Sequence, residues 1–291
     1  MLLPGAPPRH RGRRAASSTP TTSAAVGRPV RTIRVPAGDG FVLQVQQSGP
    51  PDGPPLLLLQ GQANSHRWWA GLRDDFEQFR VVSFDYRGTG GSRGPVGAWS
   101  TRSFAQDAAD VLAALGIVSA AVYATSMGGR VAQVLAAEHP GAVGRLVLAC
   151  TSPGGPHARE RSADVRAALA DPDLEARLRA LNRLFYTDAW PHSPRESHLF
   201  GDATMTAAES RAHLRASARH DAWDLLPLIE APTLVLHGTD DAMVPTSNAP
   251  LLAQRIPGAV LHLHEGGRHG FFDEFSDVVT PLVLDFVGRL G

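Results

Sequence analysis

Hydrophobic residues along this chain occur in short runs that are separated by longer segments with helical spacing. Val30–Val35 and Phe41–Gln46 alternate between apolar and polar residues on either side of the turn Gly38-Asp39-Gly40, which predicts an antiparallel hairpin. Most later runs are apolar throughout, as expected for strands of a parallel sheet that is covered on both faces. The strands predicted after the hairpin are Leu56–Leu59, Arg80–Phe84, Ala120–Ala124, Leu146–Cys150, Thr233–Leu236 and Ala259–His264.

Segments with helical spacing lie between these strands. The clearest is Ser103–Leu115, whose apolar residues fall on one side of a helix and which Gly116 closes as a C-cap. Met127–Glu138 and Phe271–Leu290 are also predicted to be helical. Strands that alternate with helices predict an α/β fold, in which a mostly parallel sheet of eight strands has helices on both faces.

The alternation stops between residues 153 and 227. This stretch contains helical segments but no convincing strand, and the sheet pattern resumes after it. It therefore predicts a helical cap, inserted into a core made of residues 29–152 and 228–291. The predicted helices of the cap are Ala163–Leu169, Leu174–Phe185 and Ala207–Arg219.

Composition and charge narrow the classes of partner. The chain has 291 residues, 43% of them hydrophobic, and a formal net charge of zero at pH 7. A neutral chain gives no reason to expect a nucleic acid or an anionic membrane as a partner. No apolar run approaches the roughly 20 residues that a membrane span requires. We expect a cytoplasmic protein, in which the single cysteine, Cys150, is an inert packed thiol.

Residues 1–28 differ from the rest of the chain. They carry five arginines, no acidic residue, and many proline, serine, threonine and alanine residues. Such a segment cannot bury enough apolar surface to become ordered, so it predicts a disordered basic tail, or a start codon assigned too far upstream. The pair Arg13-Arg14 is a weak sign of an export signal, because no continuous apolar segment follows it.

A serine lies where one predicted strand meets a helix. The run Ala124-Thr-Ser126-Met-Gly128 follows the strand Ala120–Ala124 and opens the helix Met127–Glu138. A sharp turn at this point exposes the serine hydroxyl in front of a helix N-terminus, which stabilises negative charge. Taken alone, the pattern also fits an ordinary helix start.

Two later motifs support the catalytic interpretation. Asp240 and Asp241 follow the strand Thr233–Leu236, and His269 follows the strand Ala259–His264. The chain thus places a serine, an acid and a histidine, in that order, at the carboxyl ends of three predicted strands. This order is the one expected of an α/β-hydrolase.

At these residues the chain resembles the capped α/β-hydrolase fold serine hydrolases, an esterase- and lactonase-like family. The resemblance covers about residues 30–290, and it is specific for the superfamily but not for one substrate. The motifs that carry it are Asp85-x-Arg-Gly-x-Gly-x-Ser92, the turn at Ser126, Gly238-x-x-Asp241-x-x-Val-Pro245 and Gly267-x-His269.

The resemblance implies a role for each residue. Ser126 would be the nucleophile and His269 its general base, and the family's spacing selects Asp241 as the acid that orients the histidine. The main-chain N–H groups of Met127 and Gln62 would form the oxyanion hole. No metal and no organic cofactor are implied.

The chain departs from the family's pattern in two places. Gln60-Gly61 stands where the family often has His-Gly, and Ala124 stands where the first residue of the turn is often glycine. Because the oxyanion hole uses main-chain donors, the first change puts the local side-chain hydrogen bonds in question and leaves the donors in place.

Other residues have weaker signals. Large aromatic side chains are candidates for an apolar substrate pocket, and Met127 is expected near the substrate. His262 and His264 share one face of a strand, and a solvated face explains them better than a metal site. His237 is expected to be a packing residue, and Asp85 and Arg87 are expected to brace loops. The candidate pocket residues are Trp68, Phe185, Trp190 and Trp223.

We therefore expect a serine hydrolase that cleaves a carboxylic ester or lactone, a small molecule, through an acyl-serine intermediate. Two alternatives use the same three residues: cleavage of a carbon–carbon bond, as in meta-cleavage product hydrolases that share the run Ser126-Met-Gly-Gly129, and perhydrolysis without a cofactor. A third is a small-molecule receptor that keeps the residues but does not turn over a substrate. The sequence does not indicate the substrate or the oligomeric state.

Overall fold

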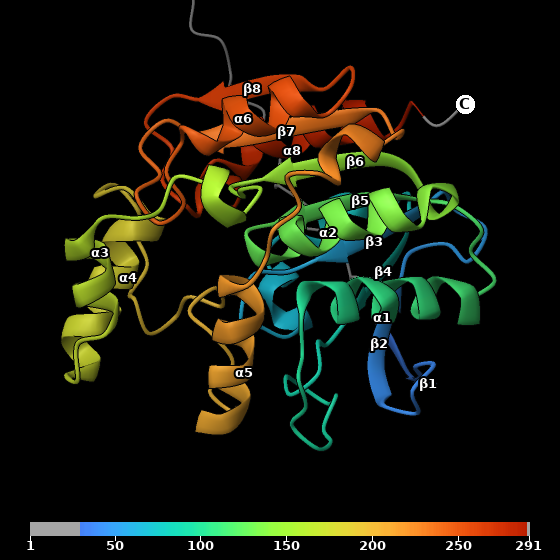
Figure 1. Cartoon of the computed structure of the whole chain (residues 1–291), viewed down its shortest axis with the longest axis horizontal. Coiled ribbons are helices and arrows are strands. Elements are labelled where there is room, and N and C mark those ends of the chain that lie inside the picture. Colours follow the sequence, from blue (N-terminus) through green and yellow to red (C-terminus); the bar gives the residue numbers. More distant parts are fainter. Residues whose placement is uncertain (1–29, 290–291) are drawn as a thin grey trace, which may run out of the picture.

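The computed structural model describes residues 30–289, so the predicted basic tail, residues 1–28, lies outside the described residues. The strands form one eight-stranded sheet in the order β1-β2-β4-β3-β5-β6-β7-β8 (Figure 1). β2 pairs antiparallel with β1 and β4, and the other neighbours are parallel, which confirms the predicted sheet. The strands are β1 (Arg31–Pro36), β2 (Val42–Ser48), β3 (Pro55–Leu59), β4 (Arg80–Phe84), β5 (Ala120–Thr125), β6 (Val143–Ala149), β7 (Thr233–Gly238) and β8 (Val260–His264).

Helices follow most of the strands, as in an α/β fold. The α-helices are α1 (Thr101–Ala114), α2 (Met127–Glu138), α3 (Ala163–Leu169), α4 (Leu174–Phe185), α5 (Ala207–Ala218), α6 (Asn248–Arg255), α7 (Phe271–Glu274) and α8 (Ser276–Val287). Short 3-10 helices are η1 (His66–Trp69), η2 (Arg73–Phe76), η3 (Pro140–Ala142), η4 (Gly155–His157) and η5 (Leu226–Leu228).

The apolar run of β3 shows why the sheet needs helices on both faces. Leu57 and Leu59 pack in a core cluster that also holds buried residues of α1, α2 and α6. Leu56 points to the other face, into a cluster with residues of α7 and α8. Every leucine of this run is fully buried, so each face has to be covered.

One helix was not predicted and another needs correction. α6 has no counterpart among the predicted helices; Pro250 lies in its first turn, where proline is tolerated. The segment Phe271–Leu290 was predicted as one helix, but it is divided at Phe275, whose φ of −111° and ψ of 37° are not helical. α8 then ends at Val287.

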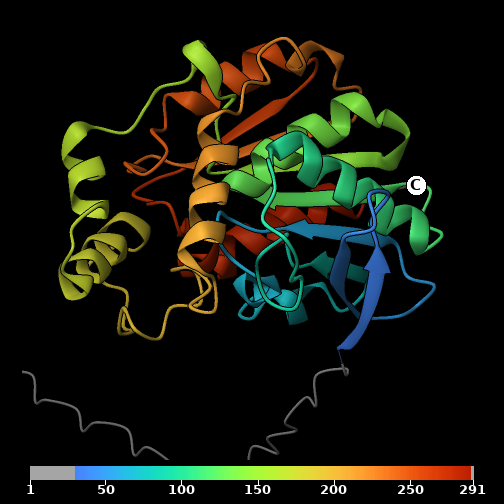
Figure 2. The ribbon, with the colours of Figure 1, turned by 60° about the horizontal axis from the view of Figure 1, so that its bottom comes forward.

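Residues 153–227 form a helical insertion between β6 and β7. α3 and α4 lie to one side of the sheet, and α5 lies between them and the rest of the molecule, in both views (Figures 1 and 2). In the described part of the chain, the insertion has no strand, and its one bridge joins Gly154 to Asp221. This segment, called the insertion below, lies beyond the carboxyl ends of the parallel strands.

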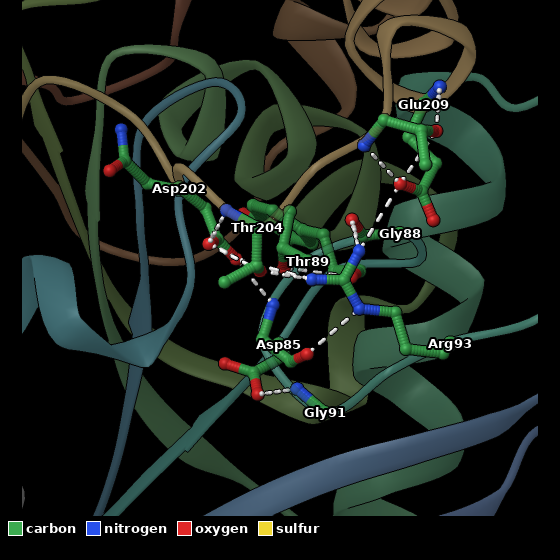
Figure 3. Close-up of polar contacts among 12 residues, drawn as sticks. Asp85, Gly88, Thr89, Gly91, Arg93, Asp202, Thr204 and Glu209 are labelled. Atoms are coloured by element: carbon green, nitrogen blue, oxygen red, sulfur yellow. Dashed lines mark hydrogen bonds and ion pairs between the residues drawn. The ribbon is translucent and has the colours of Figure 1, made fainter.

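A cluster of polar contacts fastens the insertion to the loop that follows β4 (Figure 3). Arg93 donates through Nη1 to Glu209 of α5 at 3.2 Å and to the main-chain oxygen of Gly88 at 2.9 Å. The amide of Gly90 donates to a carboxylate oxygen of Asp202 at 2.6 Å. The loop and the insertion are therefore held together by charged groups on both sides.

Candidate active site

Ser126 lies in the tight turn between β5 and α2, with φ of 53° and ψ of −121°. A left-handed conformation is uncommon for a residue with a side chain, and it persists only where the surrounding structure holds it. Gly128 makes the turn possible, because a Cβ there would lie 2.1 Å from the main-chain oxygen of Leu59. The amide of Ser126 donates to the oxygen of Ala149 at 2.9 Å, which ties the turn to β6.

The structure brings Ser126, His269 and Asp241 into one line of hydrogen bonds. Nε2 of His269 lies 3.0 Å from Oγ of Ser126, and Nδ1 of His269 lies 2.8 Å from Oδ2 of Asp241. Asp241 follows β7 and His269 follows β8, so three neighbouring regions of the sheet edge supply the three side chains. The amide of His269 also donates to the oxygen of Leu184 at 3.0 Å, which anchors its loop to α4.

Asp241 is buried and held by several donors. Its Oδ1 accepts from the amides of Met243 at 2.9 Å and Val244 at 2.8 Å. Burial opposes ionisation, but the charges and hydrogen bonds of His269 and His237 outweigh it and hold the pKa of Asp241 well below its usual range. The carboxylate is therefore ionised at neutral pH. Its neighbour Asp240 is exposed, in line with the expected solvated turn.

A cavity of about 270 Å³ opens onto Ser126 and His269. Gln62 and Met127 line it together with Ser126, and so do Trp68 and Phe185 among the predicted pocket residues. The cavity also receives side chains of the insertion, so its shape depends on both parts of the molecule.

The loop that carries Gln62 is held by side chains, including the unusual Gln60. Nε2 of Gln60 donates to the main-chain oxygen of Phe84 at 2.7 Å. Asn64 donates through Nδ2 to the oxygen of Gln62 at 3.1 Å and accepts from the amide of Gly201 at 3.2 Å. Gln60 thus braces this loop where the family often has a histidine.

A family model described as the alpha/beta hydrolase fold matches residues 54–208, which is more than half of the chain. The chain belongs to this family. A non-heme chloroperoxidase of Streptomyces lividans is 29% identical to it over 279 residues, covering 87% of this chain and 98% of the relative. The serine hydrolase BPHL of Homo sapiens is 27% identical over 280 residues, with 91% and 89% covered. The solved structure of an esterase, RhEst1 from Rhodococcus sp. ECU1013, is similar at a TM-score of 0.76 and 28% identity, with 89% and 99% covered.

Two of the predicted pocket residues do not line the cavity of this α/β-hydrolase. Trp190 stacks on Tyr186, with 4.5 Å between the ring centroids and 4° between the planes. Trp223 stacks on His157 at 4.2 Å and lies under the guanidinium of Arg255 at 5.0 Å. Each indole packs against other aromatic rings outside the cavity. The sequence of a helical insertion does not fix which side of a helix faces the cavity.

Sequence reasoning missed several residues around this site. His237 does pack at the end of β7, as expected, but its Nε2 also lies 3.2 Å from Oδ2 of Asp241 and 2.9 Å from the oxygen of Val244. His213 of α5 accepts from the amide of Ala63, 3.2 Å away, in the loop beside Gln62. No sequence signal marks these contacts, because each joins segments that are brought together only by the fold.

Asp85 and Arg87 brace loops, as expected. Asp85 is fully buried and accepts from the amide of His66 at 2.7 Å and the amide of Gly91 at 2.9 Å. Arg87 forms ion pairs with Asp39 and Asp107. Neither residue lines the cavity.

The structure also describes the surroundings of the histidines on β8 and of the single cysteine. Between residues 30 and 289, no group of three or more His, Cys, Asp or Glu residues is placed to hold a metal ion. His264 packs on Phe275, with 4.4 Å between the ring centroids. Burial raises the pKa of the Cys150 thiol, so the cysteine is a poor nucleophile.

Within residues 30–289, no helix has the length and the apolar character needed to cross a membrane.

Proposed function

We propose that this α/β-hydrolase cleaves a carboxylic ester or lactone through an acyl-serine intermediate. The observation that carries the proposal is the line of hydrogen bonds from Ser126 through His269 to Asp241, with Ser126 and His269 facing a cavity of about 270 Å³. The similarity to an esterase at 28% identity over 89% of the chain supports an ester as the substrate class.

In the proposed mechanism, His269 takes the proton of the Ser126 hydroxyl as the serine attacks the carbonyl carbon. A general base in this position typically contributes about 10²–10⁴-fold in rate. Asp241 fixes the histidine tautomer with Nδ1–H toward the carboxylate and stabilises the imidazolium that forms. His269 then gives the proton to the leaving alcohol, and a water molecule repeats the cycle to release the acid.

The tetrahedral oxyanion would be bound by the amides of Met127 and Gln62. Met127 is the first residue of α2, so its N–H belongs to the positive end of the helix. Removing one such donor costs roughly 2.7–4 kcal/mol of transition-state stabilisation in a well-studied hydrolase. The side chains of Gln60 and Asn64 would keep the second donor in place.

The insertion, residues 153–227, would serve as the cap that selects the substrate. It contributes Phe185 and Phe200 to the cavity wall, whereas the nucleophile and its base come from the sheet edge. Differences in substrate between members of this fold would then follow from the cap and not from the three catalytic side chains.

One relative supports a second candidate function. The similarity to a protein named non-heme chloroperoxidase favours perhydrolysis, in which hydrogen peroxide replaces water in attacking the acyl-serine. The same three residues and the same intermediate would serve both reactions, so the choice of acyl acceptor distinguishes them.

The test is turnover of short-chain p-nitrophenyl esters and lactones by Ser126→Ala beside the unchanged protein. We expect a loss of at least about 10³-fold in kcat, because removal of the nucleophile leaves only binding and oxyanion stabilisation. Ser119→Ala, at an exposed position before β5, is the matched control and should keep full activity.

Two results would contradict the proposal. Wild-type turnover by Ser126→Ala would show that Ser126 is not the nucleophile. Labelling of Ser126 by a fluorophosphonate without turnover of any ester or lactone would favour a receptor that keeps the catalytic residues.

A further inference from the structure

Arginine side chains give one wall of the cavity a positive charge. Arg130, Arg161 and Arg177 line the same space as Ser126 and His269. No aspartate or glutamate is among the described residues that line it. Much of the remaining wall is apolar.

Arg130 lies on α2, four residues after Ser126, and its hydrogen bonds go to neutral oxygens. Nη1 donates to the main-chain oxygen of Ser217 at 2.7 Å and to its hydroxyl at 3.0 Å, and Nη2 donates to the hydroxyl of Ser152 at 2.9 Å. Burial lowers the pKa of Arg130 to about 10. This pKa is still well above neutral pH, so the side chain stays charged there. A guanidinium has five N–H groups, and these contacts leave some of them for a ligand.

The other two arginines belong to the insertion. Nη1 of Arg161 lies 3.0 Å from the sulfur of Met243, and Nη1 of Arg177 donates to the main-chain oxygen of Asp171 at 2.5 Å. Across residues 30–289, no ion pair joins Arg130, Arg161 or Arg177 to an acidic residue. The acid whose charge acts on both Arg130 and Arg161 is Glu160, which is exposed.

The place of these arginines distinguishes them from others in the molecule. Arg87 is neutralised by Asp39 and Asp107. Arg73 donates to the hydroxyls of Ser48 and Ser83. A buried guanidinium can therefore have a purely structural role without an acidic partner. Arg73, however, does not line the cavity. Arg130 and its two neighbours are instead accessible from the space where the substrate would bind.

We propose that the substrate of this hydrolase carries a carboxylate group, which Arg130 and Arg161 bind while Ser126 attacks the ester or lactone carbonyl. The inference rests on the proposed function and specifies its substrate class: a half-ester of a dicarboxylic acid, or a lactone that carries a free carboxylate. A planar guanidinium matches the two oxygens of a carboxylate, and a charge-assisted hydrogen bond is strongest where water is excluded.

The two arginines come from different parts of the molecule, and this adds a consequence. Arg130 belongs to α2, the helix that directly follows Ser126, whereas Arg161 belongs to the insertion. A carboxylate bound between them joins the insertion to the core. Binding of the correct substrate would thereby also fix the position of the cap over Ser126.

The test compares two p-nitrophenyl esters that differ in one terminal group: the mono-p-nitrophenyl ester of adipic acid, which is anionic, and p-nitrophenyl hexanoate, which is neutral. We expect kcat/KM to be at least about tenfold higher for the anionic ester, which corresponds to about 1.4 kcal/mol. In Arg130→Gln and in Arg161→Gln, the ratio of the two kcat/KM values should fall by about tenfold. The ratio is measured within one protein, so a loss of folded enzyme cancels.

Arg179→Gln is the matched control. Arg179 lies on α4 two residues after Arg177, but its partner is Asp173 and it does not line the cavity. The ratio should not change in this variant. Equal ratios in the wild type, the control and both cavity variants would overturn the proposal.

A binding measurement separates this inference from the proposed function. Calorimetric titration with adipate, and separately with its neutral diamide, needs no turnover. Adipate should bind the unchanged protein, and this binding should weaken about tenfold in Arg161→Gln, while the diamide should not bind. If no ester is hydrolysed but adipate still binds in this way, the anion site stands and the hydrolase proposal fails. If esters are hydrolysed and inorganic phosphate binds in place of adipate, a carboxylate-bearing substrate is the wrong class.

Discussion

At the scale of single residues, the carboxylate of Asp241 makes several specific contacts that a substitution would change. It is buried, accepts from two main-chain amides, and contacts two histidines, His269 at 2.8 Å and His237 at 3.2 Å. An amide side chain keeps the size of the carboxylate but presents an N–H group or a neutral oxygen to His269. The histidine is then no longer held in the tautomer that accepts the serine proton.

Replacement of Asp241 by asparagine should therefore lower kcat by about 10⁴-fold, with a much smaller effect on KM. Steady-state kinetics on an ester substrate would measure this. Asp240→Asn is the control, because Asp240 is exposed and should keep wild-type kinetics. A loss of equal size in both variants would count against Asp241 as the orienting acid.

The low pKa of Asp241 also predicts a dependence of stability on pH. A carboxyl whose pKa is lowered by folding stabilises the native state above its unfolded pKa, about 4, and this contribution is lost as the pH falls toward the folded pKa. The difference in free energy of unfolding between the wild type and Asp241→Asn should thus shrink as the pH falls below about 4. Urea unfolding at a series of pH values measures it, and a difference that stays constant down to about pH 2 would contradict it.

Gly128 tests the packing of the turn at the same scale. A Cβ at this position would lie 2.1 Å from the oxygen of Leu59, a main-chain atom that cannot move without shifting β3. Gly128→Ala should lower the free energy of unfolding by about 1–3 kcal/mol, the usual cost of overpacking. Gly141→Ala is the matched control, since a Cβ there has open space within 4 Å, and denaturant titration compares the two.

At the scale of elements, the attachment of the insertion is the feature that a variant can probe. Arg93 joins the loop after β4 to the insertion through Glu209 and Thr204, and Asp202 completes the cluster through the amide of Gly90 (Figure 3). Loss of this arginine leaves the buried carboxylate of Glu209 with fewer partners. The insertion should then separate more often from the loop.

Arg93→Ala should accordingly increase hydrogen–deuterium exchange at the amides of α5 and raise KM, with little change in exchange at β3 and β5. Arg102→Ala is the control, because Arg102 forms an exposed pair with Glu138 on the core, and such pairs contribute little. Exchange in α5 that matches the wild type would show that the apolar contacts of the insertion hold it without Arg93.

At the scale of the whole molecule, the strands account for how three distant side chains meet. Ser126, Asp241 and His269 each follow a strand, and β5, β7 and β8 run parallel within one sheet, so their carboxyl ends lie at the same edge. The helices that cover both faces hold this edge in place, and the insertion lies over it (Figures 1 and 2).

The sequence by itself determined the features that depend on local order. The apolar runs marked the strands of an α/β fold, and the residues that follow them gave Ser126, His269 and the adjacent Asp240 and Asp241 as candidates, because a parallel strand always delivers its end to the same edge. The resemblance to the α/β-hydrolases then selected Asp241. The helix Asn248–Arg255, which has a proline in its first turn, was not among the helices predicted from the sequence.

Only the tertiary structure decided which side chains the cavity receives. From the sequence, Trp190 and Trp223 were pocket candidates on the same grounds as Trp68, which is the one of the three that lines the cavity. Nothing in the sequence distinguishes Arg130 and Arg161 from the other arginines of the chain. The direction in which an insertion side chain points depends on packing between segments that are far apart in sequence. That packing placed two indoles elsewhere and left positive charge beside the serine.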